Sequence, residues 1–304
     1  MKVWLKRAGV GVGGVVLLVF VGGGAYAAVK SSAYETSMSK VYDVPLPAVT
    51  RSTDAKVIER GKHLVEATAG CVSADCHGAD LGGGKPISMG PVGTFHGPNV
   101  TPGSLLDSYN DGELARLVKH GVKKDGRSVR FMPSQDLSWL PDDELTAIVS
   151  YLRTVPPVQR TIPASEVGVL GKVLDQRGEL AIDIARRIDH AKKEAVGSPE
   201  PSAGYGKFLA RSCQGCHGEG FSGGPIPGAP ASVPIPTNLT PHATGIAAWS
   251  YEDFDKVLTQ GLKKNGNKLD PFMPLDAIGK LNETEKKALF AFFGTLSAKP
   301  FGQR

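Results

Sequence analysis

The sequence repeats itself at an offset of about 140 residues, and this repeat limits the possible folds more than any other feature of the chain. Five short motifs recur in the same order and almost the same register. They are Cys-His-Gly at 76–78 and 216–218, Gly-Gly at 83–84 and 223–224, Asn-x-Thr-Pro at 99–102 and 238–241, Gly-x-Lys-Lys at 121–124 and 261–264, and Phe-Met-Pro at 131–133 and 272–274. The alternative is chance recurrence in a chain rich in Gly and Pro, but chance does not keep five markers in register. We therefore expect two similar units, in agreement with a length of 304 residues, at which single cores usually divide.

Each unit carries signals for two helices. Residues 55–68 and 203–211 precede the cysteines, and the closing helices begin at Pro141 and Asn282, where acidic residues lead into apolar residues at helical spacing. The segments between these helices are expected to be loops. The predicted fold is all-α, a tandem pair of units at residues 54–157 and 202–304.

A connector at residues 158–201 links the two units. Part of it has an amphipathic pattern, with Leu174, Ile182, Ile184 and Ile188 set among charged residues. This pattern favours a helical segment packed between the two units. The sequence assigns it no function.

The N-terminus differs from the rest of the chain. Lys2, Lys6 and Arg7 precede an uncharged run at residues 8–29, which is typical of export. The run is long enough for an uncleaved transmembrane helix, although Ala25-Tyr26-Ala27 also suits signal peptidase. We predict a membrane anchor or signal peptide at residues 1–30, with the anchor favoured, and a Ser-, Thr- and Pro-rich tether at residues 31–53. The units would then lie on the periplasmic side of the bacterial inner membrane.

Charge excludes one class of partner. The formal net charge is +5, and Lys2, Lys6 and Arg7 supply three of these positive charges. The remaining body is nearly neutral, whereas nucleic-acid binding requires a basic face on a recognisable module. No nucleic-acid partner is expected.

The second unit contains a C-x-x-C-H motif at residues 213–217, the pattern of covalent haem c attachment. Cys213 and Cys216 can reach the two vinyl groups of one porphyrin, and His217 is then held beneath the iron as an axial ligand. A zinc site usually needs four ligands, and a thioredoxin-like pair does not require the histidine. A disulfide is a further alternative in an exported protein.

The first unit departs from this spacing, because four residues separate Cys71 from Cys76, which is followed by His77. Multihaem cytochromes are known to use such a gap, so we predict a second haem here. The alternative is a disulfide between Cys71 and Cys76 with His77 idle. The chain has four Cys, and two attachment sites use all of them.

Methionine is the expected second axial ligand, since His/Met ligation raises the reduction potential of a c-type haem. Met132 lies 55 residues after His77, and Met273 lies 56 residues after His217, both within Phe-Met-Pro. A single Met is more often a packing residue, but this matched pair predicts ligands. For the first haem, Met89 and His96 remain alternatives. The other histidines, at positions 63, 120, 190 and 242, are interpreted as packing or surface residues.

Both units resemble class I cytochrome c domains, with an attachment motif, a distal Met-Pro loop and a closing helix in that order. Residues 99–102, 238–241 and 249–254 more narrowly resemble the cytochrome subunits of membrane-bound alcohol and gluconate dehydrogenases. Those subunits typically carry three haems, and this chain has motifs for two. The resemblance implies redox protein partners, either a dehydrogenase or respiratory complex as donor and a cytochrome or oxidase as acceptor.

The leading hypothesis is an electron carrier, or an electron-transfer subunit, that is not itself an enzyme. The alternative is a di-haem enzyme such as a cytochrome c peroxidase or a thiosulfate dehydrogenase. Such an enzyme needs an open iron or an unusual ligand. A Met-Pro in each unit and the absence of a spare Cys argue against it.

Overall fold

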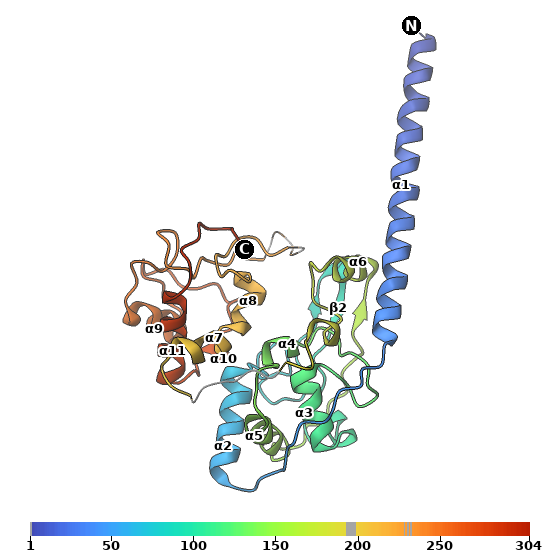
Figure 1. The fold of residues 1–304 in the computed structure, drawn as a ribbon. Coiled ribbons are helices and arrows are strands. Elements are labelled where there is room, and N and C mark those ends of the chain that lie inside the picture. The colour runs from blue at the N-terminus through green and yellow to red at the C-terminus, as the bar shows by residue number, and fades with distance from the viewer. Residues whose placement is uncertain (1, 193–198, 228, 230, 232) are drawn as a thin grey trace.

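The computed structural model describes residues 2–192, 199–227, 229, 231 and 233–304, with side chains described from Val21 onwards. The connector residues 193–198 therefore lie outside the described residues, as do the basic side chains of Lys2, Lys6 and Arg7. The chain forms two lobes and a long N-terminal helix that extends away from them (Figure 1). The first lobe contains α2, α3 and α5, and the second contains α7 to α11.

The first lobe consists of short helices joined by ordered loops. Their bounds are α2 Ala55–His63, the π-helical turn η1 Leu64–Thr68, the 3-10 turn η3 Leu105–Ser108, α3 Asp111–His120, α4 Ser134–Leu137 and α5 Asp142–Leu152. The predicted helices at 55–68 and from Pro141 are confirmed. Helix α3, in contrast, lies where a loop was expected. It begins with a capping box between Asn110 and Glu113 and ends at Gly121 with a left-handed φ of 62°.

The second lobe repeats this order of helices. Its elements are α7 Ala203–Leu209, α8 Arg211–His217, α9 Tyr251–Gln260, α10 Leu275–Ile278 and α11 Glu283–Gly294. Helix α9 also occupies an expected loop, with a capping box between Ser250 and Asp253 and a left-handed Gly261. Asn282 caps α11, as its sequence predicted.

The first and last helices of each lobe cross at a glycine. A Cβ atom on Gly61 in α2 would lie 1.9 Å from the carbonyl oxygen of Ala147 in α5. A Cβ atom on Gly206 in α7 would lie at the same distance, 1.9 Å, from the carbonyl oxygen of Ala288 in α11. Only glycine permits this approach of two backbones. The two lobes therefore have the same close helix crossing at a glycine, at matched positions of the repeat.

The fold is mostly helical, but the prediction of an all-α fold needs correction. A small antiparallel sheet forms from β1 Ile87–Ser88, β2 Gly93–Phe95 and β3 Glu166–Val167, with the 3-10 turn η2 Gly90–Val92 between the first two strands. Strand β3 belongs to the connector and pairs with β2 of the first lobe. Such short strands give too little alternation to be recognised from sequence.

The connector lies on the first lobe and α1, not between the lobes as predicted. Its helix α6 Val169–Arg177 packs against α1 and η2, and its 3-10 turn η4 Ala185–Arg187 contacts α4. Leu174, Ile182 and Ile184 are buried, which explains the amphipathic pattern. Pairing of β3 with β2 directs the connector back onto the first lobe.

The segment predicted as a tether at residues 31–53 is also packed. Helix α1 covers Lys2–Ser39, and its Tyr34 and Met38 are buried against β2, α6 and the connector. Beyond the helix, Tyr42 and Val44 are buried in a smaller cluster with Val122. These aromatic and apolar side chains are too few to show periodicity, yet they fix the segment to the first lobe.

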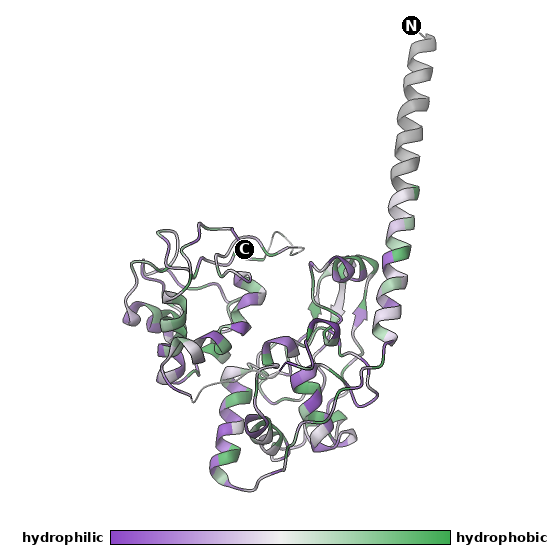
Figure 2. Ribbon diagram, viewed as in Figure 1, coloured by the Kyte–Doolittle hydropathy of each residue, from purple (hydrophilic) through white to green (hydrophobic). Residues whose placement is uncertain are grey.

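Within the part of the chain that the structure describes, no helix is both long and apolar enough to cross a membrane. Most of the uncharged run at residues 8–29 belongs to α1, and its side chains before Val21 are outside the described part (Figure 2, grey). The predicted anchor at residues 1–30 therefore rests on the sequence.

A continuous hydrophobic core joins the two lobes. One cluster of buried residues contains Leu64, Val118 and Leu145 from the first lobe together with Leu258 and Phe293 from the second. A polar network lies beside it around Glu285, whose side chain is 1% exposed. The Glu285 carboxylate accepts hydrogen bonds from His63 Nε2 at 2.7 Å and Thr68 Oγ1 at 3.3 Å. The two lobes thus share one hydrophobic core.

Candidate functional site

A cavity of about 190 Å³ lies in the second lobe and contains three of the predicted site residues. Cys213 and His217 line it from α8, and Met273 lines it from the loop before α10. The rest of the lining is mainly apolar or aromatic. It includes Leu209, Leu239, Ile246, Trp249, Phe254, Val257, Leu258, Leu269, Ile278, Leu281, Leu289 and Phe293.

The imidazole of His217 is held in a fixed orientation. Its Nδ1–H donates to the backbone carbonyl of Thr237 at 2.7 Å, which leaves the Nε2 lone pair free to bind a metal. Burial lowers the pKa of His217 and outweighs the opposing effect of the Thr237 carbonyl. His217 is therefore neutral at neutral pH, as an iron ligand must be.

The cysteines of the second lobe are held as neutral thiols that are not paired with each other. Burial raises the pKa of Cys213 to about 12 and also raises the pKa of Cys216. Covalent haem c with His/Met ligation requires two thiols, an imidazole and a thioether. Cys213, His217 and Met273 line the cavity, and Cys216 lies beside them on α8. The residues present fit that group.

The first lobe orients its predicted histidine in the same way, although residues 71–77 form turns where Cys213 to His217 lie in α8. His77 Nδ1–H donates to the Pro98 carbonyl at 2.8 Å, at the repeat position of Thr237. Burial lowers the pKa of His77 and raises that of Cys71 to about 12, and it also raises the pKa of Cys76. Cys71 and Cys76 are likewise unpaired, so the structure does not form the alternative disulfide.

An Asn-x-Thr motif ties each histidine loop to the end of its lobe. The Asn99 side-chain oxygen accepts from Thr101 Oγ1 at 2.7 Å, and Asn238 accepts from Thr240 Oγ1 at 2.8 Å. Each Asn Nδ2 donates at 2.7 Å to a backbone carbonyl beyond the closing helix, that of Val158 or of Lys299. The motif is structural and positions the carbonyls that orient His77 and His217.

Met132 and Met89 lie in different packing environments. Met132 and Cys71 pack against the same main core. Met89 packs against the separate cluster beneath α1 and α6.

Each distal methionine loop contacts the other lobe. Helix α4, which follows Met132, contacts α8, while α10, which follows Met273, contacts η1 just before Cys71. The nearby Asp136 side chain on α4 adds to the rise in the pKa of Cys213. Burial raises the pKa of Asp136 itself to about 7. Ala67 and Thr68 of η1 also line the cavity of the second lobe. These contacts could not be predicted, because the repeat contains no information on how its copies dock.

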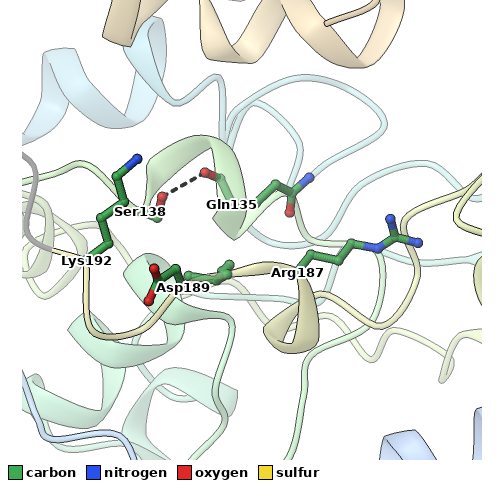
Figure 3. A pocket seen from close by; sticks show the side chains of 6 residues that line it. Gln135, Ser138, Arg187, Asp189 and Lys192 are labelled. Atoms are coloured by element: carbon green, nitrogen blue, oxygen red, sulfur yellow. Dashed lines mark hydrogen bonds between the residues drawn. The ribbon is translucent and has the colours of Figure 1, made fainter.

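A second pocket, of about 220 Å³, differs in character from the first. It lies between the α4 region, with Gln135 and Ser138, and the connector, with Arg187, Asp189 and Lys192 (Figure 3). Within this wall, Ser138 Oγ donates to the Gln135 carbonyl at 2.9 Å. The polar lining of this pocket contains none of the predicted haem residues.

Comparison with known families identifies the first lobe. Residues 58–156, which run from within α2 to just beyond α5, match the Cytochrome c family. Over this range the chain is similar to cytochrome c, and the range includes Cys71, Cys76, His77 and Met132.

Several curated proteins are similar to part of this chain. It is 39% identical over 95 residues to the gluconate 2-dehydrogenase cytochrome c subunit of Pantoea cypripedii, a match that covers 29% of this chain and 22% of that protein. It is 34% identical over 103 residues to the fructose dehydrogenase cytochrome subunit of Gluconobacter japonicus, a match that covers 32% of this chain and 21% of that protein. It is 30% identical over 116 residues to a di-haem cytochrome c-type protein of Cereibacter sphaeroides, covering 33% and 36% of the two chains. Each match to a dehydrogenase cytochrome thus spans about a fifth of that protein's length.

Proposed function

We propose that this chain is a di-haem electron-transfer protein in which residues 202–304 form a second cytochrome c domain. One observation carries the proposal: Cys213, His217 and Met273, predicted from their sequence spacing, line one apolar cavity. The chain acts as an electron carrier or an electron-transfer subunit and not as an enzyme. The names of its relatives, cytochrome subunits of dehydrogenases among them, support this role.

Each domain would hold one covalently bound haem c. Cys71 and Cys76 attach the first, with His77 and Met132 as axial ligands. Cys213 and Cys216 attach the second, with His217 and Met273 as ligands. When bound, the haem supplies one-electron chemistry through its ferric and ferrous states.

The protein's own residues set the properties of each site. The carbonyls of Pro98 and Thr237 orient the proximal histidines, and the apolar lining of the second cavity excludes water. A methionine ligand and an apolar surrounding both favour a high reduction potential. The reciprocal contacts of the distal loops bring the two sites together, which supports electron transfer between the domains.

We propose that the chain works on the periplasmic side of the bacterial inner membrane, held there by residues 1–30. The basic start and the uncharged run at 8–29 support this placement. The backbone of α1 is helical over Lys2–Ser39 and extends away from the lobes (Figure 1). Its partners would be a dehydrogenase or respiratory complex as donor and a cytochrome or oxidase as acceptor.

The anchor gives a direct prediction for cell fractionation. We expect the full chain in the membrane fraction, released by detergent and not by high salt, because an apolar helix holds it. A variant with a cleavable signal peptide in place of residues 1–30 should be found in the soluble periplasm with the same haem spectrum. A full chain that is soluble, with a mature N-terminus just after Ala27, would show that the segment is a signal peptide.

Replacement of the distal methionines tests the redox sites. Met132→Ala and Met273→Ala should each lower one of two reduction potentials, by on the order of 100 mV within the range that axial ligands span. Each should also remove part of the charge-transfer absorption of methionine-ligated ferric haem. A spectroscopic redox titration measures both effects. Met89→Ala is the matched control and should change neither potential. If it does shift the potential of the first site, Met89 and not Met132 is the ligand.

A further inference from the structure

The two Phe-Met-Pro motifs are identical over three residues but have different surroundings. Phe131 stacks on the buried Phe95 of β2, with ring centroids 4.2 Å apart and an angle of 16° between the planes. Phe272, at the same repeat position, is 51% exposed. The residue before each distal methionine is therefore packed in the first domain and open in the second.

The connector holds the first loop through its backbone. The Phe131 N–H donates to the Ile182 carbonyl at 2.9 Å, and Arg130 forms an antiparallel bridge with Asp183. Phe131 has a φ of 61°, an unfavourable value for a non-glycine residue that its surroundings must maintain. The ring stack and this backbone pairing fix the chain directly before Met132.

A buried carboxylate in turn fixes the connector. Asp175 in α6 is fully buried, and its Oδ1 accepts the N–H groups of Ile182 at 2.9 Å and Asp183 at 3.0 Å. Arg186 and Arg187 pair with the same carboxylate at 2.7 and 3.2 Å. A buried, paired and hydrogen-bonded carboxylate makes a rigid support.

The second loop is held by local bonds. The Phe272 N–H donates to the Asp270 side chain at 2.9 Å, and the Met273 N–H donates to the Asp270 carbonyl at 3.0 Å. Residues 264–268, 270–272 and 274 are all exposed. Among the described residues, the backbone of residues 270–273 makes no backbone hydrogen bond to a segment distant in sequence. The contacts of this loop with other segments are made at its two ends, where Lys264 pairs with Asp253 at 2.8 Å and α10 contacts η1.

We propose that Phe131, Phe95 and the backbone of residues 182–184 form a clamp that locks Met132, whereas Met273 is replaceable by an external ligand. The second site would then admit a small neutral nitrogen base at the distal position, and the first would not. Phe131 is a positioning residue in this scheme, because it acts through Met132. The inference rests on the proposed function, since it concerns the displacement of the two axial methionines.

Imidazole binding to the ferric, full-length holoprotein tests the clamp. Imidazole should remove the methionine charge-transfer absorption in two steps, with affinities that differ by about tenfold or more. Met273→Ala should abolish the tighter step and Met132→Ala the weaker step. A single step, or a tighter step that belongs to Met132, would overturn the proposal.

Matched variants separate the clamp from general stability. Phe131→Ala keeps the Cβ and its backbone strain but loses the ring, so imidazole should bind the first site about tenfold more tightly. Phe95→Leu removes the stacking partner far from Met132 in sequence and should act in the same direction. Phe131→Tyr should restore the wild-type affinity, and Phe272→Ala should leave both steps unchanged.

Two further results distinguish a failure of the clamp from a failure of the proposed methionine ligands. If Phe131→Ala and Phe272→Ala shift imidazole binding equally, the clamp is wrong while methionine ligation stands. If the untreated ferric protein has no methionine charge-transfer absorption, the proposed ligands themselves are wrong, and the clamp falls with them.

Discussion

Replacing Cys213 and Cys216 together with Ala is expected to halve the covalently bound haem, from two groups per chain to one. Without the thiols no thioether bonds can form, and the cavity of the second domain loses the group that its apolar lining surrounds. The remaining haem is attached through Cys71 and Cys76. The mass of the denatured chain and the haem absorbance per polypeptide measure this result.

The reciprocal variant, with Cys71→Ala and Cys76→Ala, provides the control. It should also leave one haem, now in the second domain. The cysteines of both motifs are unpaired, so the remaining pair is still available to attach a haem. A wild-type chain with one haem, unchanged by this variant, would mean that the four-residue gap does not support attachment. The two double variants together assign each potential of the redox titration to one domain.

Three of the predicted site residues come together in the structure, whereas parts of the fold around them differ from the prediction. Cys213, His217 and Met273 were predicted from motif spacing alone, and the structure brings them to one cavity. The closing helices were also predicted, because acidic first turns and apolar periodicity are local signals. Local chemistry and helix ends can be read from a few neighbouring residues.

Two missed helices had signals that were available. Asn110 with Glu113 and Ser250 with Asp253 are capping pairs, and Gly121 and Gly261 follow at the helix ends. These capping pairs and glycines lie at corresponding positions of the two repeat units.

Other features depend on contacts distant in sequence. The shared Phe-Met-Pro motif does not distinguish Phe131 from Phe272. Phe131 is packed because it stacks on Phe95 and its backbone pairs with the connector at residue 182, while Phe272 is exposed. The fixed position of residues 31–53 likewise depends on a few side chains such as Tyr34. Sequence periodicity carries no information on such pairings.

The buried carboxylate at the domain interface gives the second large prediction. Glu285→Ala should lower the free energy of unfolding by about 3–5 kcal/mol, the usual cost of removing one partner from a buried ionic network. The change leaves His63 and Thr68 without their acceptor and also breaks the capping box with Asn282. Chemical denaturation of the holoprotein measures the loss. Glu283→Ala, on the exposed side of the same helix, is the control and should change stability little.

The pH dependence of stability tests whether the charge of Glu285 is responsible. Burial raises the pKa of this carboxyl, but the hydrogen bond from His63 and the nearby Arg60 outweigh it and hold the pKa below the ordinary value of 4.5. A depressed pKa means that its contribution is complete above about pH 4.5 and is lost as the pH falls through the folded-state value. Glu285→Gln should therefore be less stable than wild type at neutral pH, and the difference should shrink in acid. A difference that stays constant from neutral pH into acid would assign the effect to packing and capping, and the domain interface would then owe its stability to the shared hydrophobic core.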